Sequence, residues 1–433
     1  MTGRLWAKLS TAVLGAGALL AGPFGTVGAH AAATPIQHVV VLMQENRSFD
    51  SYFGRIHFEG QPHSLPEPPG AGNPDPTNPS GPPIKVFHKT HYCEVADLNH
   101  SWNGTHAEID GGAMDGFTAA NVVPQDPTGS RTMGFYDQSD FPYYYALYNT
   151  FAMGDRYFAS APTQTFPNRL FLLAGTSFGH IRNDNFPPVP GQFAQRSIFN
   201  ELDEHHITWK VYAAQYPLAI AFLFSYVRET PAAANVRPYS QFVADAATGT
   251  LPQVAFVDPI FVAPNNVETD EHPPSNVQVG ERFTSSVIST LFKSPNWGSS
   301  ALFLTYDEHG GFFDHVAPPP AVPPDDTAPM LLPGDTPGAF DIYGIRVPAV
   351  IVSPFARSHF VSHVVNDHTS ILRFIETDFG LPALTRRDAA ANPMLEFFDF
   401  SHPTFATPPE LPAAPVNPAE AAYCASQPSN TTP

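Results

Sequence analysis

Past residue 33 the sequence has no uninterrupted apolar run of the roughly 20 residues that a transmembrane helix needs. Positive charge is also scarce, because 21 Lys and Arg stand against 40 Asp and Glu and give a formal net charge of -19. Such a chain repels a phosphate backbone, which argues against binding to nucleic acid. Metal binding stays open, since hard cations are bound by carboxylates.

The one substantial apolar stretch, residues 9–22, lies near the N-terminus. It follows Arg4 and Lys8 and leads to the small residues at 29–33. This order is typical of a secretory signal peptide. We therefore expect residues 1–33 to be removed and the mature chain to be secreted or periplasmic, with a net charge of -21 once the two basic residues are lost. An uncleaved membrane anchor is the alternative.

Cysteine is nearly absent, with Cys93 and Cys424 alone in the chain. In an oxidising compartment two distant cysteines often pair. We expect a disulfide that joins the C-terminal tail to the N-terminal part of the fold. Two unpaired thiols are the alternative.

Proline, in contrast, is abundant, with 48 residues. The prolines cluster at 62–83, 318–337 and 403–433. These stretches lack hydrophobic periodicity and predict surface loops and a tail. We expect one catalytic domain over residues 34–400, with residues 401–433 packed against it as a proline-rich tail.

Five short apolar runs rich in β-branched residues predict buried strands of a parallel sheet. The runs are residues 38–43, 207–212, 254–257, 301–306 and 347–352. Helical periodicity lies between them, at residues 168–174, 281–293 and 369–378. Pro167 suits the first position of the earliest of these helices. Strands that alternate with helices indicate an α/β fold with helices on both faces of a mostly parallel sheet.

Polar residues directly follow two of the predicted strands. Glu45 and Asn46 come after the first strand, and Asp307 and Glu308 come after the fourth. Parallel sheets bind ligands beyond the carboxyl ends of their strands, so both clusters would face one crevice. Carboxylates gathered there repel one another unless a cation lies between them, which predicts a metal site. Two solvated acidic turns are the alternative.

Thr165 is the candidate nucleophile. It lies just before Pro167 and a predicted helix, where backbone N–H groups and the helix dipole favour anions. A metal ion in contact with the hydroxyl would lower its pKa. The alternative is that Thr165 simply caps the helix.

Four histidines stand close to acidic residues, a setting in which a carboxylate fixes the imidazole tautomer or raises its pKa. They are His100, His272, His315 and His368. Each one alone is more often a surface or capping histidine. His91, His106 and His309 are competitors for the same roles.

Four motifs resemble those of the phosphoesterase family that contains bacterial phospholipases C, an acid phosphatase group and plant non-specific phospholipases C. They are Glu-Asn-Arg-Ser-Phe-Asp at 45–50 with Tyr-Phe-Gly at 52–54, Thr-x-Pro-Asn-Arg at 165–169, Asp-Glu-x-Gly-Gly-x-x-Asp-His-Val at 307–316, and Gly-x-Arg-Val-Pro at 344–348 followed by Ser-Pro. The resemblance covers about residues 35–380, with all four motifs in order.

The resemblance implies an alkaline-phosphatase-like α/β fold and one divalent metal ion. Glu45, Asn46, Asp307 and Glu308 would hold the metal, and Thr165 would reach it. The register before Pro-Asn-Arg selects Thr165, with Thr163 as the fallback. Histidines at 100, 272 and 315 would bind phosphate oxygens or protonate the leaving group. Phosphate contacts are further expected from the set Arg169, Asp314 and His368.

The function implied is a secreted, metal-dependent phosphoric-ester hydrolase of the phospholipase C type that forms a phosphothreonine intermediate. A phospholipid substrate would add transient contact with a membrane surface. An acid phosphatase that takes monoesters is the main alternative. A sulfatase-like hydrolase is disfavoured by threonine at position 165, and a non-catalytic binding protein by the intact motifs. The metal, the head-group preference and the oligomeric state stay open.

Overall fold

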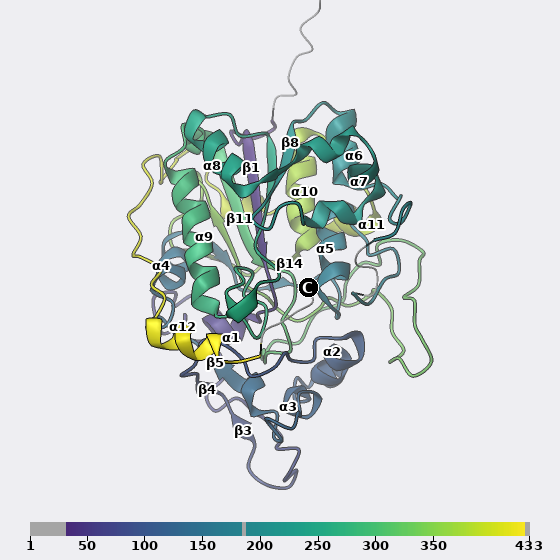
Figure 1. Ribbon diagram of the computed structural model, residues 1–433, viewed down its shortest axis with the longest axis vertical. Coiled ribbons are helices and arrows are strands. Elements are labelled where there is room, and N and C mark those ends of the chain that lie inside the picture. The colour runs from purple at the N-terminus through teal and green to yellow at the C-terminus, as the bar shows by residue number, and fades with distance from the viewer. Residues whose placement is uncertain (1–31, 184–187, 429–433) are drawn as a thin grey trace, which may run out of the picture.

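A computed structural model describes residues 32–183 and 188–428. The predicted signal peptide therefore lies almost wholly outside the described residues. Within them the main sheet has eight strands in the order β13-β6-β12-β11-β1-β10-β8-β9. Helices cover both of its faces, with α4, α8 and α9 on one side of the strands and α5, α6 and α10 on the other (Figure 1). The predicted α/β fold is confirmed.

All five predicted strands are present, with ends shifted by up to two residues. The strands of the sheet are β1 (His38–Gln44), β6 (Ala152–Gly154), β8 (Trp209–Ala213), β9 (Val236–Pro238), β10 (Val254–Asp258), β11 (Ser300–Tyr306), β12 (Ala349–Val352) and β13 (Phe360–Ser362). β1 pairs in parallel with both β10 and β11, whereas β12 runs antiparallel to β11 and to β6. The expectation that the fifth run is a parallel strand was wrong, since an apolar run carries no signal for direction.

The larger helices are α2 (Trp102–Ile109), α4 (Pro142–Thr150), α5 (Thr165–Ala174), α6 (Ile198–Glu204), α8 (Tyr239–Thr248), α9 (Val277–Phe292), α10 (His368–Phe379) and α12 (Pro418–Ala425). Shorter ones are α1 (Phe49–Phe53), α3 (Phe117–Ala120), α7 (Ser225–Glu229) and α11 (Arg386–Ala390). Three two-stranded pairs complete the fold: β2 (Gly72–Asn73) with β3 (Ile84–Lys85), β4 (Phe87–His88) with β5 (Gly134–Phe135), and β7 (Tyr157–Phe158) with β14 (Asn366–Asp367).

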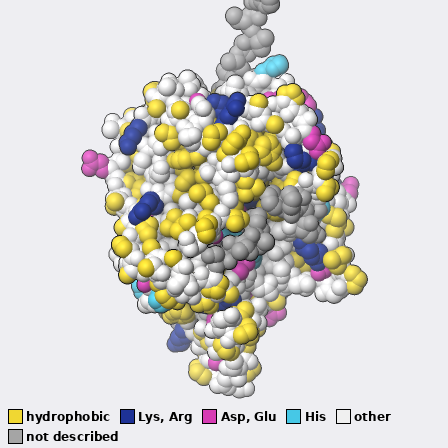
Figure 2. Space-filling view, viewed as in Figure 1, with side chains coloured by type: hydrophobic (Ala, Val, Ile, Leu, Met, Phe, Trp, Pro, Cys, Tyr) yellow, Lys and Arg dark blue, Asp and Glu magenta, His cyan; other side chains and the backbone are white. Residues whose placement is uncertain are grey.

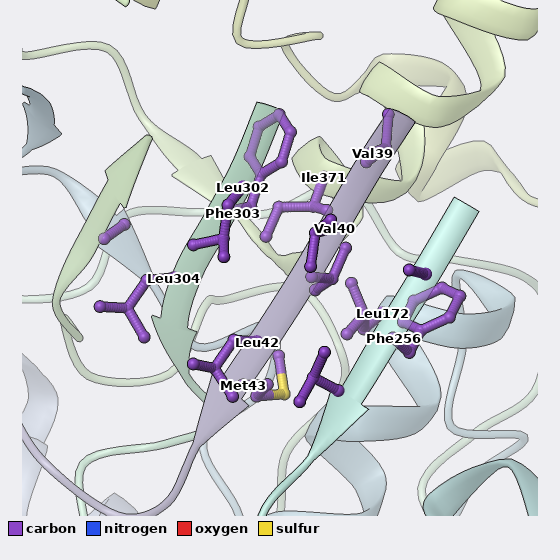
Figure 3. Close-up of a cluster of buried hydrophobic side chains, with 14 of the residues drawn as sticks. Val39, Val40, Leu42, Met43, Leu172, Phe256, Leu302, Phe303, Leu304 and Ile371 are labelled. Carbon is purple, nitrogen blue, oxygen red and sulfur yellow. The ribbon is translucent and has the colours of Figure 1, made fainter. Parts of the chain in front are cut away.

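The core is built on β1, which lies between β11 and β10. Its residues Val39 to Met43 are almost fully buried, because helices cover both faces of this part of the sheet. Leu172 of α5 and Ile371 of α10 pack beside the strand side chains (Figure 3). Burial on both faces explains why this strand reads as a continuous apolar run. It also fixes where the strand ends and the polar residues begin.

The C-terminal tail crosses the domain and is tied to it. Cys93 and Cys424 form a disulfide, which confirms the predicted pairing. Nearby, the side-chain amide of Asn266 donates to the carbonyl of Cys424 at 2.8 Å, and Gln278 of α9 accepts from the backbone of Asn417 at 2.9 Å. Among the described residues no helix is both long enough and apolar enough to cross a membrane.

Candidate functional site

The two polar clusters predicted at strand ends meet in the folded chain. β1 and β11 are neighbouring parallel strands that end level with each other, at the pair Gln44 and Tyr306. The residues that follow, Glu45 and Asn46 on one side and Asp307 and Glu308 on the other, are all buried. The backbone N–H of Asn46 donates to Oδ1 of Asp307 at 3.0 Å. The meeting of the two strand ends therefore gathers three carboxyl groups.

The turn after β1 lies so close to the segment after β11 that this segment needs a glycine. Asn46 has a positive φ of 61°, the left-handed region that Asn tolerates better than most residues. This conformation brings the carbonyl of Asn46 against Gly310, where a Cβ atom would clash with it. Gly310 itself has a φ of 64°. The glycine after Asp307 and Glu308 thus permits the close approach of the two strand ends.

Thr165 is the first residue of α5, and this N-terminal end of the helix lies against the carboxyl cluster. The helix begins three residues earlier than the periodicity indicated, so Pro167 is its third residue. A proline is tolerated there because the first-turn N–H groups have no partner within a helix. Gln164 is the capping residue, and the Thr165 hydroxyl does not cap the helix. It donates instead to Oδ1 of Asn46 at 3.4 Å.

The fallback hydroxyl at position 163 is engaged elsewhere. Thr163 is buried and donates to the carbonyl of Ile181 at 2.6 Å. Of the two threonines, Thr165 is the one whose hydroxyl reaches the residues at the strand ends.

Arg169, one turn further along α5, is the counter-charge of the cluster. Its Nη2 lies 2.9 Å from Oε1 of Glu45, and its Nε lies 3.4 Å from Oδ2 of Asp307. Burial raises the pKa of Glu45 to about 8 and that of Asp307 to about 6, although the guanidinium opposes both shifts. One guanidinium therefore faces two of the three buried carboxyl groups, Glu45 and Asp307. The sequence placed Arg169 nearby but did not reveal these two partners.

Two histidines hold the remaining carboxylate. Nδ1 of His100 lies 2.5 Å from Oε1 of Glu308, and Nδ1 of His309 lies 3.4 Å from Oε2. Burial opposes ionisation of Glu308, but the two imidazoles lower its pKa to about 2. His309 is itself bonded at 2.6 Å to the buried Glu108. In the sequence, the only sign of these pairs was that acidic residues lie close to the histidines.

His272 faces His100 from the loop after β10. Their rings meet edge to face with centroids 5.7 Å apart, and Asp97 lies within 4.0 Å of both imidazoles. Burial lowers the pKa of His272. Asp97 is half-exposed, so this group stands at the solvent side of the buried carboxyl cluster.

His315 belongs to a second network, in which Asp50 and His315 come from the same two motifs as the carboxyl cluster. Its Nδ1 lies 2.6 Å from Oδ2 of Asp50, and Arg346 binds the other oxygen of Asp50 at 2.7 Å and also Asp314 at 3.1 Å. Burial disfavours the imidazolium, yet the carboxylate of Asp50 raises the pKa of His315. The same Arg346 and His315 lower the pKa of Asp50 against the effect of its burial. Asp314 is thus turned toward Arg346.

His368 is the first residue of α10 and is fully buried. Its Nε2 lies 2.7 Å from the carbonyl oxygen of Asp307, and burial lowers its pKa to about 4. Through this contact the neutral imidazole holds the backbone of Asp307 in place. The sequence could not distinguish this setting from that of the more exposed histidines.

The residues of the carboxyl cluster fit a divalent cation. Asp307 Oδ2 is a buried carboxylate oxygen without a hydrogen-bond partner among the described residues. Carboxylate and amide oxygens, which this cluster offers, are the ligands that such ions prefer. Asp97, His100 and His272 form a further group whose donor atoms lie within 4.8 Å of one another. Asp50 and Asp314 already have Arg346 and His315 as counter-charges, and this third acidic group therefore does not call for a metal ion.

The sequence is similar to several bacterial and plant enzymes. Phospholipase C B of Mycobacterium tuberculosis is 32% identical over 466 residues, which covers 95% of this chain and 88% of the relative. Non-specific phospholipase C1 of Arabidopsis thaliana is 32% identical over 85% of this chain and 72% of its own. Non-hemolytic phospholipase C of Pseudomonas aeruginosa is 31% identical over 88% of this chain and 60% of its own.

Among solved structures, a protein of the alkaline phosphatase superfamily from Vibrio parahaemolyticus matches with a TM-score of 0.37 and 10% identity. That match covers 83% of this chain and 72% of the other. The model of the Phosphoesterase family matches residues 36–382. Since this match spans most of the sequence and the relatives exceed 30% identity, the chain belongs to the phosphoesterase family and is a hydrolase of phosphoric ester bonds.

Proposed function

We propose that the protein is an exported, metal-dependent phospholipase C that uses Thr165 as its nucleophile. The observation that carries the proposal is the hydrogen bond of the Thr165 hydroxyl to Asn46 inside the carboxyl cluster. The similarity to enzymes named phospholipase C supports the substrate class. The disulfide supports export to an oxidising compartment.

The metal site proposed is Glu45, Asn46, Asp307 and Glu308, with Thr165 beside it. These donors surround buried negative charge that Arg169 balances only in part. A bound divalent cation would act as a Lewis acid and favour the alkoxide form of a nearby hydroxyl. Arg169 would hold Glu45 and Asp307 in place, and His368 would fix the backbone at Asp307.

In the proposed reaction, the Thr165 hydroxyl loses its proton to solvent, and its Oγ1 attacks the phosphorus atom. The bond from phosphorus to the oxygen of the leaving alcohol breaks, and that oxygen takes a proton. Water then cleaves the covalent phosphoryl-threonine, which carries the head group when the substrate is a diester, and Thr165 is regenerated. The N-terminus of α5 and the imidazoles of His100 and His272 would bind the phosphate oxygens.

We assign the proton for the leaving alcohol to His315. Its side chain is partly exposed, and Asp50 favours its protonated form. A general acid must hold its proton when the substrate binds, and its efficiency is best when its pKa lies near the working pH. Burial lowers the pKa of His272, which suits a hydrogen-bonding role in the neutral state.

A paired assay on the purified protein tests the proposal. One arm uses p-nitrophenylphosphorylcholine and the other uses p-nitrophenyl phosphate, each with and without chelator. Chelator-sensitive cleavage of the choline ester, together with release of diacylglycerol from phosphatidylcholine, is the result expected. Cleavage of the monoester alone would establish an acid phosphatase instead. No cleavage in either arm by metal-loaded protein would contradict both and return the sulfatase-like and non-catalytic alternatives.

A further inference from the structure

Three consecutive hydrophobic side chains are exposed in the proline-rich loop 318–337. Met330, Leu331 and Leu332 keep 47%, 39% and 60% of their surface accessible. The loop projects from the body near α5 and α11 (Figure 1), and hydrophobic side chains also lie along that edge of the molecule (Figure 2). Single exposed apolar residues are ordinary, whereas a contiguous group on a projecting loop indicates an interaction site. We call residues 330–332 the apolar tip.

The apolar tip is fixed to the segment that lies along the start of α5. Arg182 donates to the carbonyl of Met330 at 3.3 Å and forms an ion pair with Asp335. The next residue, Asn183, accepts a hydrogen bond at 2.9 Å from the backbone of Phe166, which directly follows Thr165. One short chain of contacts therefore connects the apolar tip to the proposed nucleophile.

The other side of the loop is fixed to α2. The indole of Trp102 donates to the carbonyl of Thr336 at 2.9 Å, and Asn103 accepts from the backbone of Thr336 at 2.8 Å. Trp102 is the first residue of α2 and lies two positions after His100. The loop is thus held between the two segments that carry Thr165 and His100. Its exposed side chains are presented in a fixed position close to the site.

The charges around the apolar tip restrict what it can meet. Between Lys293 and Arg346 the sequence has no Lys or Arg, while the loop carries Asp325, Asp326 and Asp335. The arginines that reach the loop, Arg182 and Arg386, are paired with Asp335 and Asp326. Proteins bind anionic membranes through clusters of Lys and Arg, which this loop lacks. A membrane surface without net charge therefore suits the apolar tip better than an anionic one. The face in Figure 2 likewise shows only scattered Lys and Arg among its hydrophobic side chains.

We propose that the apolar tip docks the protein onto a zwitterionic phospholipid surface by inserting Leu331 and Leu332 between the lipid head groups. The inference rests on the proposed function, because the phosphodiester of a phospholipid lies at such a surface. Insertion beside the segments that carry Thr165 and His100 brings the site to the head groups. The partner is the lipid surface itself, and its binding is separable from cleavage.

Vesicle sedimentation tests the proposal. All proteins carry Thr165→Ala, so that lipid is not consumed, and are mixed with vesicles of pure phosphatidylcholine. Leu332→Asp adds charge to the apolar tip, and Val364→Asp adds the same charge at an exposed site on another loop. We expect at least about tenfold weaker partitioning for Leu332→Asp and no change for Val364→Asp. Equal partitioning of the two proteins would overturn the proposal.

A second variant works in the opposite direction and does not depend on loss of binding. Leu332→Trp places an indole at the apolar tip, and Trp favours the interface of a bilayer. We expect its fluorescence to shift to shorter wavelength on addition of phosphatidylcholine vesicles and to be quenched by brominated lipid. The parent protein gives the background from the three tryptophans of the mature chain, Trp102, Trp209 and Trp297. No change beyond that background would overturn the proposal.

A soluble substrate separates this proposal from the proposed function. With Thr165 intact, Leu332→Asp should cleave p-nitrophenylphosphorylcholine at the normal rate while its activity on vesicles falls about tenfold. Failure of every protein to cleave the soluble diester would count against the proposed function alone, and vesicle sedimentation would still decide the docking. Loss of a dimer in Leu332→Asp, with vesicle binding unchanged, would assign the apolar tip to a second copy of the chain and overturn the proposal.

Discussion

The imidazole of His315 lies 2.6 Å from Oδ2 of Asp50, and Arg346 binds the second oxygen of the same carboxylate at 2.7 Å. Asp50 is the second residue of α1, whereas His315 lies in the loop after β11. Two motifs far apart in the sequence thus meet in one buried ion pair. We propose that this contact sets the protonation of the acid that serves the leaving alcohol.

The first prediction concerns the pH dependence of kcat/KM. Asp50, Asp314, Arg346 and Glu67 are the charged or titratable groups that act on His315, and Asp50 raises its pKa against the effect of burial. A general acid works below its pKa, so activity is present at lower pH and is lost as pH rises through the raised value. In Asp50→Asn the pKa of His315 should fall, and the alkaline limb should move to lower pH.

Asp399→Asn is the matched control for that shift. Asp399 contacts His402 at the exposed surface, so its loss should leave the profile unchanged. Thermal unfolding of both proteins checks that Asp50→Asn still folds. An alkaline limb that stays in place in folded Asp50→Asn would remove His315 from the role of acid.

Metal removal gives the second prediction. Without a cation, the buried Glu45 and Asp307 depend on Arg169 as their counter-charge. We expect chelation to lower the rate on a soluble diester at least about 100-fold, and added divalent metal to restore it. Asp307→Asn should also lose bound metal in elemental analysis.

The control for the metal site is Asp245→Asn. Asp245 is paired with Lys210 and lies outside all four motifs. This variant should keep the metal content of the parent protein. A parent protein that is active and free of divalent metal would refute the proposed site.

The third prediction concerns the disulfide between Cys93 and Cys424. It closes a loop with a sequence separation of 331 residues and so limits the unfolded chain strongly. Replacement of both cysteines by serine should lower the free energy of unfolding by about 2–5 kcal/mol. Denaturant unfolding of the parent protein, the double variant and the reduced parent measures this. Equal stability of all three would show that the disulfide adds nothing to the stability of the fold.

Much of the fold was predictable because buried strands are recognisable from composition alone. The run that became β1 is apolar on both faces, and its end marks where Glu45 and Asn46 begin. The meeting of this end with Asp307 followed from the rule that parallel strands end at one edge of a sheet. Strand direction did not follow, so the antiparallel β12 was missed.

The electrostatic partners within the site were the part that the sequence could not supply. Arg169 meets Glu45 across 124 positions, and Arg346 meets Asp50 across 296. Loops bring these groups together, and no local pattern encodes the path of a loop. The start of α5 was also misplaced, because a proline is allowed anywhere in the unpaired first turn and does not mark its first residue.

The most direct test of the central claim is to trap the covalent intermediate. Protein that is turning over p-nitrophenylphosphorylcholine is quenched in acid, digested and analysed by mass spectrometry, with Thr165→Ala and Thr163→Ala in parallel. The account predicts a phosphocholine adduct on Thr165 in the parent and in Thr163→Ala, and neither adduct nor turnover in Thr165→Ala. Near-normal turnover by folded Thr165→Ala, or an adduct on another residue, would contradict it.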